Sequence, residues 1–300
     1  MSVFKNWIHA ARLRTLPLSV SGIIVGTTIA VQQGYFSIVI FSLALGTTLG
    51  LQILSNFAND YGDGKKGTDN ATRVGPARAI QSGLISLKEM KRGIIATAIL
   101  TLFMAMLLIY AAFGHEHFSY AIIFFVLGVG AIAAAIKYTI GDNAYGYRGM
   151  GDVFVFLFFG LVAVLGTYFL YAREIYWLAL MPAAAIGMLS SGVLNLNNMR
   201  DRIPDETSGK ITLAVKMGEK NAKNYHYILI IGAILLMVLY SVFTADALND
   251  LIYIIAFIPL LLHLKRVVQN TDPQKLDPEL KILALSTFAV SALFGFGLLL

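Results

Sequence analysis

Residues 36–63 read FSIVIFSLALGTTLGLQILSNFANDYGD, and this stretch decides the fold class. Its first part, residues 36–58, is a continuous apolar run, and about 20 such residues are enough to cross a bilayer as a helix. Its last part is instead rich in Asn and Asp. The stretch therefore predicts a membrane-spanning helix that ends in a polar cluster at the membrane surface.

Apolar runs of the same kind recur along the whole chain. Of its 300 residues, 57% are hydrophobic and only 13% are charged, about half the charge of a typical soluble domain. The runs do not alternate between apolar and polar residues, as the strands of a membrane barrel do. We therefore expect an all-α, polytopic membrane protein whose nine transmembrane helices form a single domain over residues 1–300. The other eight predicted spans are 15–33, 93–113, 118–140, 152–172, 175–199, 224–243, 248–266 and 280–300.

Positive charge is distributed unevenly between the two sides of this predicted bundle. The net charge is +6, and every Lys and Arg except Arg173 falls on the side that holds the N-terminus. Basic residues collect on the cytoplasmic side of membrane proteins. We therefore expect the N-terminus and the functional groups on the cytoplasmic side, and the basic charge requires no nucleic-acid partner. The lack of cysteine excludes disulfides and thiolate chemistry.

The first polar cluster lies at the end of the span over residues 36–58. If the helix continues, Asn56, Asp60 and Asp63 share one face at positions i, i+4 and i+7, and Asn59 forms an i, i+4 pair with Asp63. A single acid at a membrane edge would mark only the water boundary. Several polar residues on one face instead favour a binding site.

The second polar cluster ends the span over residues 175–199, which has the same orientation. Asn197, Asp201 and Asp205 share a face at i, i+4 and i+8, and Asn198 is adjacent. The two clusters lie about half a chain apart, as in an internal repeat whose paired elements meet at a shared site. We therefore expect the two helix ends to converge.

Acidic clusters that converge need a cation, because carboxylates that face one another repel. Magnesium suits carboxylate ligands together with substrate phosphates. Basic residues follow both clusters in the sequence, and carboxylates, magnesium and Lys or Arg together are what binding a diphosphate requires. A membrane-embedded site of this kind predicts a substrate with a diphosphate head and a lipid tail.

These motifs resemble those of the UbiA superfamily of intramembrane prenyltransferases, and the resemblance covers nearly the whole chain. Residues Asn59–Asp63 resemble the first acidic motif, and Asp201–Asp205 resemble the second. Gly67 stands where the first motif usually ends in Asp, and Asp69 follows it. This variant resembles the branch that prenylates 1,4-dihydroxy-2-naphthoate in menaquinone synthesis. Three further stretches are similar to that branch: Arg73–Gly83, Tyr145–Asp152 and Gly209–Val215.

The resemblance implies a fold and a set of site residues. The fold would be a nine-helix bundle around a central cavity that opens sideways to lipid, with two Mg²⁺ ions in the site. The implied metal ligands are Asn59, Asp60, Asp63, Asp201 and Asp205. The candidates for binding the diphosphate are Lys65, Arg73, Arg78, Lys137 and Lys210. The expected supporting polar residues are Asn56, Asp69, Asn197 and Asn198.

The resemblance also implies a reaction. A polyprenyl group would pass from polyprenyl diphosphate to 1,4-dihydroxy-2-naphthoate, giving demethylmenaquinol, CO₂ and diphosphate at the cytoplasmic face of a bacterial inner membrane. Asp63 and Asp201 would act catalytically through the metal. Tyr138 and Asp152 are candidates for shielding the allylic cation or orienting the aromatic acid, and a structural role is equally open for both.

Two alternatives remain open from the sequence. One is a prenyltransferase with another acceptor, such as 4-hydroxybenzoate or homogentisate. The other is a secondary transporter that uses the carboxylates as a cation or proton relay, which predicts charged groups near the membrane midplane. Two histidines, His226 and His263, lie near the predicted inner ends of spans, and we expect them at the membrane interface.

Overall fold

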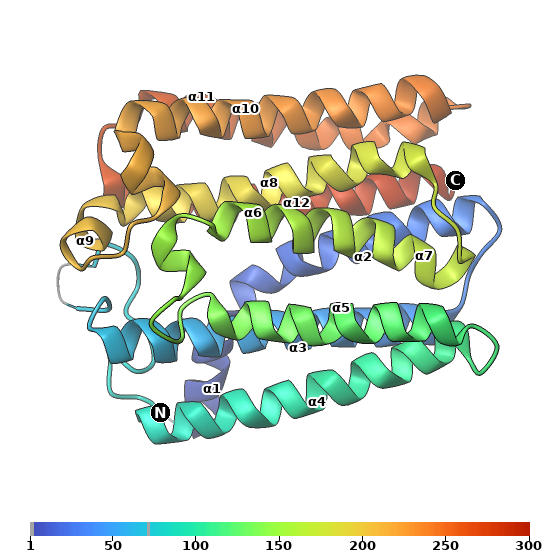
Figure 1. Ribbon diagram of the computed structural model, residues 1–300. Helices are drawn as coiled ribbons and strands as arrows, with labels where there is room; N and C mark the ends of the chain where they lie inside the picture. The colour runs from blue at the N-terminus through green and yellow to red at the C-terminus, as the bar shows by residue number, and fades with distance from the viewer. Residues whose placement is uncertain (1–2, 71–72) are drawn as a thin grey trace.

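The computed structural model describes residues 3–70 and 73–300, and these residues form a helical bundle without strands (Figure 1). In this described part, nine helical segments are long and apolar enough to cross a membrane, so the predicted all-α, polytopic fold is confirmed. The segments are α1 (Val3–Ala11), η1 (Leu13–Thr15) and α2 (Leu16–Gln32); α3 (Ile38–Lys66); α4 (Leu87–Phe113); α5 (Phe118–Lys137); α6 (Gly151–Val155), η3 (Phe156–Gly166) and α7 (Thr167–Ala172); η4 (Trp177–Ala179) and α8 (Leu180–Arg200); α10 (Leu213–Thr244); η5 (Leu248–Ala256) and α11 (Phe257–Gln269); η6 (Pro273–Lys275) and α12 (Leu276–Leu298). Two short elements, η2 (Tyr145–Arg148) and α9 (Arg202–Thr207), lie in the connections.

Most of the helices surround a central cavity, and two pack outside them. Residues of α2, α3, α4, α5, η3, α8 and α12 line the cavity. In the described chain, α10 and α11 contribute no lining residue; α10 packs on α8, and α11 packs on α12. Figure 1 shows α10 and α11 along one side of the bundle and α4 along the other.

Glycines allow the cavity wall to pack closely. A Cβ atom at Gly160 of η3 would lie 2.6 Å from the carbonyl oxygen of Ala183 and from Cα of Gly187 in α8. Small residues of this kind let membrane helices approach backbone to backbone. Segment η3 is a π-helix, a form that is often found at functional sites. This contact fixes η3 against α8, and the adjoining Phe154, Phe158 and Phe159 line the cavity.

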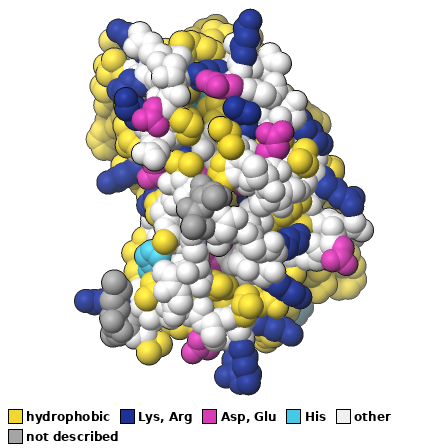
Figure 2. Space-filling model, turned by 90° about the vertical axis from the view of Figure 1, so that its left-hand side faces the viewer, with side chains coloured by type: hydrophobic (Ala, Val, Ile, Leu, Met, Phe, Trp, Pro, Cys, Tyr) yellow, Lys and Arg dark blue, Asp and Glu magenta, His cyan; other side chains and the backbone are white. Residues whose placement is uncertain are grey.

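Several helices extend past the predicted spans at the charged end of the bundle. Helix α3 continues to Lys66, beyond the predicted end at residue 58, and stops where Gly67 adopts a φ of +72°, a conformation that glycine tolerates best. Helix α10 begins at Leu213, where the Thr212 side chain caps it, and it is kinked at Gly218, whose φ of +73° is not helical. Figure 2 looks onto this end of the bundle and shows many Lys and Arg side chains around it.

His226 and His263, which we expected at the membrane interface, are buried between helices. Both side chains are 0% exposed, and their Nε2 atoms lie 2.9 Å apart between α10 and α11. His263 Nδ1 lies 2.7 Å from a carboxylate oxygen of Glu279 in α12, which also binds Arg266. Both ring nitrogens of His263 have partners, His226 and Glu279, which lie on other helices, whereas Nδ1 of His226 has no hydrogen-bond partner among the described residues.

Candidate active site

The two acidic helix ends converge, as the sequence predicts. Asn56, Asp60 and Asp63 lie in one continuous helix, α3. Helix α8 ends at Arg200, but the N–H of Asp201 donates to the Asn197 carbonyl at 3.1 Å, and the N–H of Asp205 donates to the Asp201 carbonyl at 2.8 Å. The second cluster therefore keeps helical spacing across the break between α8 and α9.

Two basic side chains join the clusters. Lys210 Nζ lies 3.5 Å from Asp63 Oδ2 and 3.7 Å from Asp205 Oδ1. Arg73 lies 3.2 Å from Asp69 and 3.6 Å from Asp201. Burial, and then the nearby charge of Arg78, lower the pKa of Arg73 to about 10, so it stays cationic at neutral pH. The acids from both halves of the chain therefore form one site.

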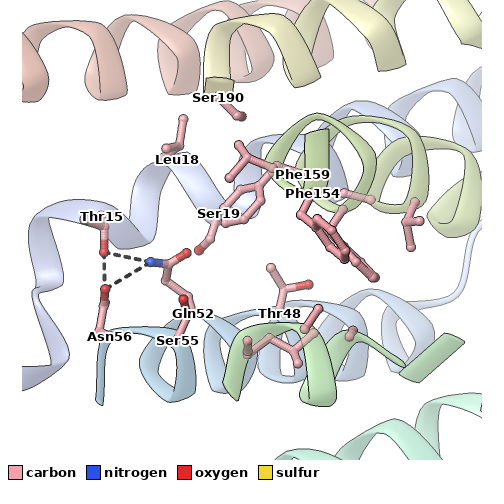
Figure 3. A pocket seen from close by; sticks show the side chains of 18 of the residues that line it. Thr15, Leu18, Ser19, Thr48, Gln52, Ser55, Asn56, Phe154, Phe159 and Ser190 are labelled. Carbon is pink, nitrogen blue, oxygen red and sulfur yellow. Dashed lines mark hydrogen bonds between the residues drawn. The ribbon is translucent and has the colours of Figure 1, made fainter. Parts of the chain in front are cut away.

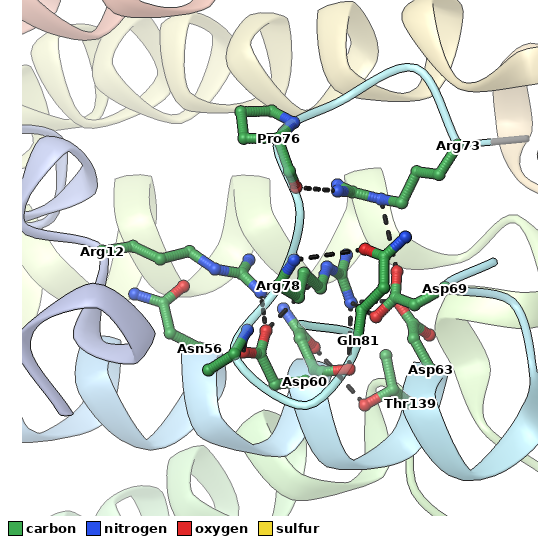
Figure 4. A network of polar contacts seen from close by, with 12 residues as sticks. Arg12, Asn56, Asp60, Asp63, Asp69, Arg73, Pro76, Arg78, Gln81 and Thr139 are labelled. Atoms are coloured by element: carbon green, nitrogen blue, oxygen red, sulfur yellow. Dashed lines mark hydrogen bonds and ion pairs between the residues drawn. The ribbon is translucent and has the colours of Figure 1, made fainter. Parts of the chain in front are cut away.

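Arg78 lies at the centre of the first cluster (Figure 4). Its guanidinium lies 2.6 Å from Asp63, 3.0 Å from Asp69 and 3.9 Å from Asp60. Burial acts to lower the pKa of Arg78, but the three carboxylates outweigh it and raise the pKa above its ordinary value. Burial raises the pKa of Asp69, although the charges of Arg78 and Arg73, which both pair with it, oppose the rise.

Asp60 has a partner that the sequence did not reveal. Its carboxylate pairs with the guanidinium of Arg12, which lies before the first span, and accepts a hydrogen bond from the N–H of Ala79 at 3.3 Å. The only sequence signal for Arg12 was its place among the basic N-terminal residues. Its contact depends on how α1 and η1 fold back over α3, which spacing along one helix cannot show.

Asp201 is likewise held by a neighbour, Arg200. The guanidinium of Arg200 donates to both carboxylate oxygens, at 3.1 and 2.6 Å, and the N–H of Gly75 donates to one of them at 3.2 Å. Burial raises the pKa of Asp201, but the hydrogen bonds and charge of Arg200 outweigh it, so the pKa is lowered overall. Asp201 is therefore ionised at neutral pH.

Asp63 is oriented by a tyrosine that was not among the predicted site residues. The Tyr147 hydroxyl lies 2.7 Å from Asp63 Oδ1 and 2.7 Å from Thr68 Oγ1. Burial and the charge of Asp63 raise the pKa of Tyr147, so the hydroxyl keeps its proton and donates to the carboxylate. Tyr147 lies in the Tyr145–Asp152 motif, which was the one signal that could have identified it.

A cavity of about 380 Å³ extends from this polar cluster into the bundle. Asn59, Asp63, Arg78 and Lys210 line its polar end, and Tyr138 and Asn197 also face it. The rest of its wall is mostly apolar and aromatic. Figure 3 shows a part of that wall, where Phe154 and Phe159 lie across from the polar side chains of α3.

The donor set fits a hard divalent cation. The predicted ligands offer carboxylate and amide oxygens, which magnesium prefers. Asp205 is 4% exposed, and its Oδ2 has no hydrogen-bond partner among the described residues. Burial is the main reason that the pKa of Asp205 rises to about 6, although Lys210 opposes the rise. Within residues 3–70 and 73–300, no three acidic or histidine side chains already surround one point, because basic side chains lie between them.

Some predicted residues lie outside this cluster. Lys65 and Lys137 are exposed, and neither makes an ion pair with another described residue. Asp152 is buried on α6, near the hydroxyl of Tyr225 rather than among the other acids. Asn56 donates to the carbonyl of Ala11, so it binds the N-terminal segment. Asn198 is buried on α8. The roles predicted for these five residues stay predictions.

An apolar cavity inside a membrane bundle, with acids and bases gathered at one end, is the arrangement of an intramembrane prenyltransferase. The chain belongs to the UbiA prenyltransferase family, whose sequence profile matches residues 19–296. It is 39% identical to the 1,4-dihydroxy-2-naphthoate octaprenyltransferase of Escherichia coli (strain K12). The 294 aligned residues cover 98% of this chain and 95% of the relative. It is 41% identical to the protein of the same name from Haemophilus influenzae. The 299 aligned residues cover 99% of this chain and 96% of that relative.

Solved structures establish the same fold. The apo structure of a UbiA homolog from Aeropyrum pernix K1 matches with a TM-score of 0.71 at 16% identity, over 94% of this chain and 97% of that one. A UbiA homolog from Archaeoglobus fulgidus, solved bound to GPP and Mg²⁺, matches with a TM-score of 0.66 at 17% identity, over 96% and 99% of the two chains. The predicted family and the predicted UbiA-type bundle are therefore confirmed.

Proposed function

We propose that this chain transfers a polyprenyl group from polyprenyl diphosphate to 1,4-dihydroxy-2-naphthoate, giving demethylmenaquinol, CO₂ and diphosphate. The observation that carries the proposal is the joining of two acidic helix ends by Lys210 and Arg73 at the polar end of an apolar cavity. The acceptor is supported by two relatives, 39% and 41% identical, that are named for this substrate.

In this proposal, the basic residues at the cavity end bind the diphosphate. Lys210 and Arg78 line the cavity there, and Arg73 lies behind them. Charge-assisted hydrogen bonds from such groups to phosphate oxygens are among the strongest in proteins. The apolar remainder of the cavity would hold the lipid tail.

Two Mg²⁺ ions would be held by Asn59, Asp60, Asp63, Asp201 and Asp205, directly or through water. Magnesium bound there supplies fixed positive charge against the negative charge that develops on the leaving diphosphate, which is usually the largest catalytic contribution. The fit rests on the oxygen-only donor set and on the unpartnered Oδ2 of Asp205. The related fold that was solved with GPP and Mg²⁺ supports the use of a divalent ion.

The chemistry requires that water be excluded from the cavity. The allylic C–O bond breaks, a ring carbon of the acceptor forms the new C–C bond, and the acceptor loses its carboxylate as CO₂. Phe158 and Phe159 line the cavity and exclude water from the cation. Tyr138 lines it too, edge-on to Tyr145 with ring centroids 5.3 Å apart, and we assign it to shielding the cation. We assign Asp152 to orienting the aromatic acid.

We place this site at the cytoplasmic face of a bacterial cell membrane. The support is the distribution of charge, because Lys and Arg gather at the end of the bundle that holds both acidic clusters (Figure 2). At the opposite end, Arg173 is the one exception in the sequence. The acids lie at helix ends rather than at mid-span, which argues against a transport relay at the membrane midplane.

Transfer of an isotope-labelled prenyl group in membranes tests the proposal. We expect Asp63→Ala and Asp201→Ala each to lower the rate at least about 100-fold, whereas Asp246→Ala, an exposed acid at the other end, should be near normal. A near-normal rate in either site variant would remove the metal-site assignment. Parallel assays with 4-hydroxybenzoate and homogentisate test the acceptor, and movement of a labelled ion without prenyl diphosphate would instead indicate a transporter.

A further inference from the structure

The wall of the cavity carries a polar atom that a lipid tail cannot satisfy. Gln52 lies on α3 about 16 Å along the helix from Asp63, given a rise of about 1.5 Å per residue, so it is well away from the diphosphate end. Its side chain is 9% exposed and lines the cavity. Its Oε1 atom has no hydrogen-bond partner among the described residues. A buried acceptor of this kind is costly unless a donor reaches it.

The surrounding hydrogen bonds fix the orientation of the Gln52 amide (Figure 3). The Thr15 hydroxyl donates its one proton to the Arg12 carbonyl at 2.9 Å, so towards other groups it can only accept. The Asn56 amide group donates to the Ala11 carbonyl at 2.8 Å and to Thr15 Oγ1 at 3.2 Å. The orientation of Asn56 is therefore set by a backbone carbonyl.

Gln52 consequently meets two acceptors on one side. Its Nε2 donates to Thr15 Oγ1 at 3.1 Å and to Asn56 Oδ1 at 3.5 Å. Turning the amide over would place Oε1 against both oxygens. The network therefore turns Oε1 away from Thr15 and Asn56, and no donor among the described residues reaches it.

Two further hydroxyl oxygens on the same cavity lack a hydrogen-bond partner among the described residues. They are Thr47 Oγ1 on α3 and Ser190 Oγ on α8. Phe154 and Phe159 lie across the cavity from α3 (Figure 3). Aromatic walls with a few placed polar groups suit a flat ligand that carries hydroxyl groups. They do not suit a hydrocarbon tail alone.

We propose that Gln52 Oε1 accepts a hydrogen bond from a ring hydroxyl of the aromatic acceptor and thereby selects hydroxylated rings. The inference rests on the proposed function, since it requires an aromatic acid as the second substrate. In 1,4-dihydroxy-2-naphthoate, the hydroxyl beside the carboxylate can donate internally to that carboxylate. The hydroxyl at position 4 is the free donor, so it is the one that Gln52 binds.

The test compares two acceptors in two forms of the full-length protein in membranes. The acceptors are 1,4-dihydroxy-2-naphthoate and its 4-O-methyl ether, which cannot donate at that position. The measured quantity is the ratio of their kcat/KM values in the wild type and in Gln52→Met. Any intrinsic difference in reactivity between the acceptors cancels between the two proteins. We expect the ratio to fall about tenfold in Gln52→Met, while KM for prenyl diphosphate stays the same.

A matched variant separates this role from a structural one. Thr15→Ser changes a neighbouring cavity residue but keeps the hydroxyl oxygen that accepts from the Gln52 amide nitrogen, so it should keep the wild-type ratio. If the ratio falls equally in both variants, the effect belongs to the hydrogen-bond network as a whole and not to Oε1. An unchanged ratio in Gln52→Met would overturn the proposal. If Gln52→Met does not fold, Gln52→Asn withdraws the oxygen by one methylene and should lower the same ratio. A wild type that does not prenylate the naphthoate at all would overturn the proposed function, and the role of Gln52 with it.

Discussion

Replacing Lys210 with Met is expected to destabilise the metal-free protein. Lys210 is 5% exposed, and its Nζ lies 3.5 Å from Asp63 and 3.7 Å from Asp205. At an effective dielectric constant of about 20, each contact corresponds to about 4–5 kcal/mol of attraction. Breaking a buried pair costs about 3–5 kcal/mol. Asp63 keeps Arg78, but Asp205 loses its one cation among the described residues, so we expect about 3 kcal/mol.

Mg²⁺ should recover much of this loss, because a divalent ion can take the place of the ammonium group between the carboxylates. The assay is thermal unfolding of the full chain in detergent, with and without Mg²⁺. Without Mg²⁺, we expect the unfolding temperature of Lys210→Met to fall by about 6–12 °C, and with Mg²⁺ by clearly less. Lys220→Met, an exposed residue of α10, is the control and should not change. The reasoning is refuted if Lys210→Met unfolds at the wild-type temperature without Mg²⁺, or if Mg²⁺ shifts both proteins equally.

Two other predictions concern the frame around the site. Glu279→Leu should lower the free energy of unfolding by about 1–3 kcal/mol, because the buried Nδ1 of His263 loses its hydrogen-bond partner. Unfolding measured beside Glu206→Leu, an exposed acid, checks this, and equal loss in both variants would contradict it. Gly160→Val should cost about 1–3 kcal/mol or more, because the contact of η3 with α8 leaves no room for a side chain. Gly130→Val, where a Cβ meets open space, is its control, and similar yields of folded protein from the two variants by size-exclusion chromatography would disprove the packing argument.

The bundle could be predicted from the sequence because membrane crossing depends on local composition. An apolar run such as residues 36–58 must form a helix wherever its neighbours lie, since lipid offers the backbone no hydrogen bonds. The ends of the helices were harder to predict from the sequence. Helix α3 continues through Asp60 and Asp63 because those acids meet cations inside the protein, and a helical turn capped by Thr212 precedes the kink of α10 at Gly218. The apolar composition of a segment does not show that such partners exist.

The candidate site could be predicted only in part, for a related reason. Helical spacing showed that Asn56, Asp60 and Asp63 share a face, but it could not show what lies opposite. Asn56 turned out to bind the N-terminal segment, and Asp60 turned out to pair with Arg12. Both contacts join residues that are more than 40 positions apart in the chain. Long-range partners of this kind require the packed structure.

The balance of charge in the site leads to a prediction about the order of binding. Among the described residues, the cluster holds equal numbers of carboxylates and basic groups. They are Asp60, Asp63, Asp69, Asp201, Asp205 and Asp277, with Arg12, Arg14, Arg73, Arg78, Arg200 and Lys210. Divalent ions that entered alone would leave positive charge uncompensated, and a diphosphate that entered alone would leave negative charge. Each therefore improves the site for the other, and by linkage the effect is reciprocal.

We accordingly expect Mg²⁺ and the diphosphate to bind cooperatively. Titration of the wild type with Mg²⁺ should show clearly tighter binding in the presence of a non-ionisable prenyl diphosphate analogue than in its absence. A coupling of about 1–3 kcal/mol, or about 5–150-fold in affinity, would be typical. In Lys210→Met, one positive charge is missing, so Mg²⁺ alone should bind more tightly and the coupling should shrink. If wild-type affinity for Mg²⁺ does not depend on the analogue, the basic residues do not compensate the acids in the way their contacts indicate. In a cluster without net charge, either ligand bound alone leaves buried charge unpaired, so binding of one ligand must favour binding of the other.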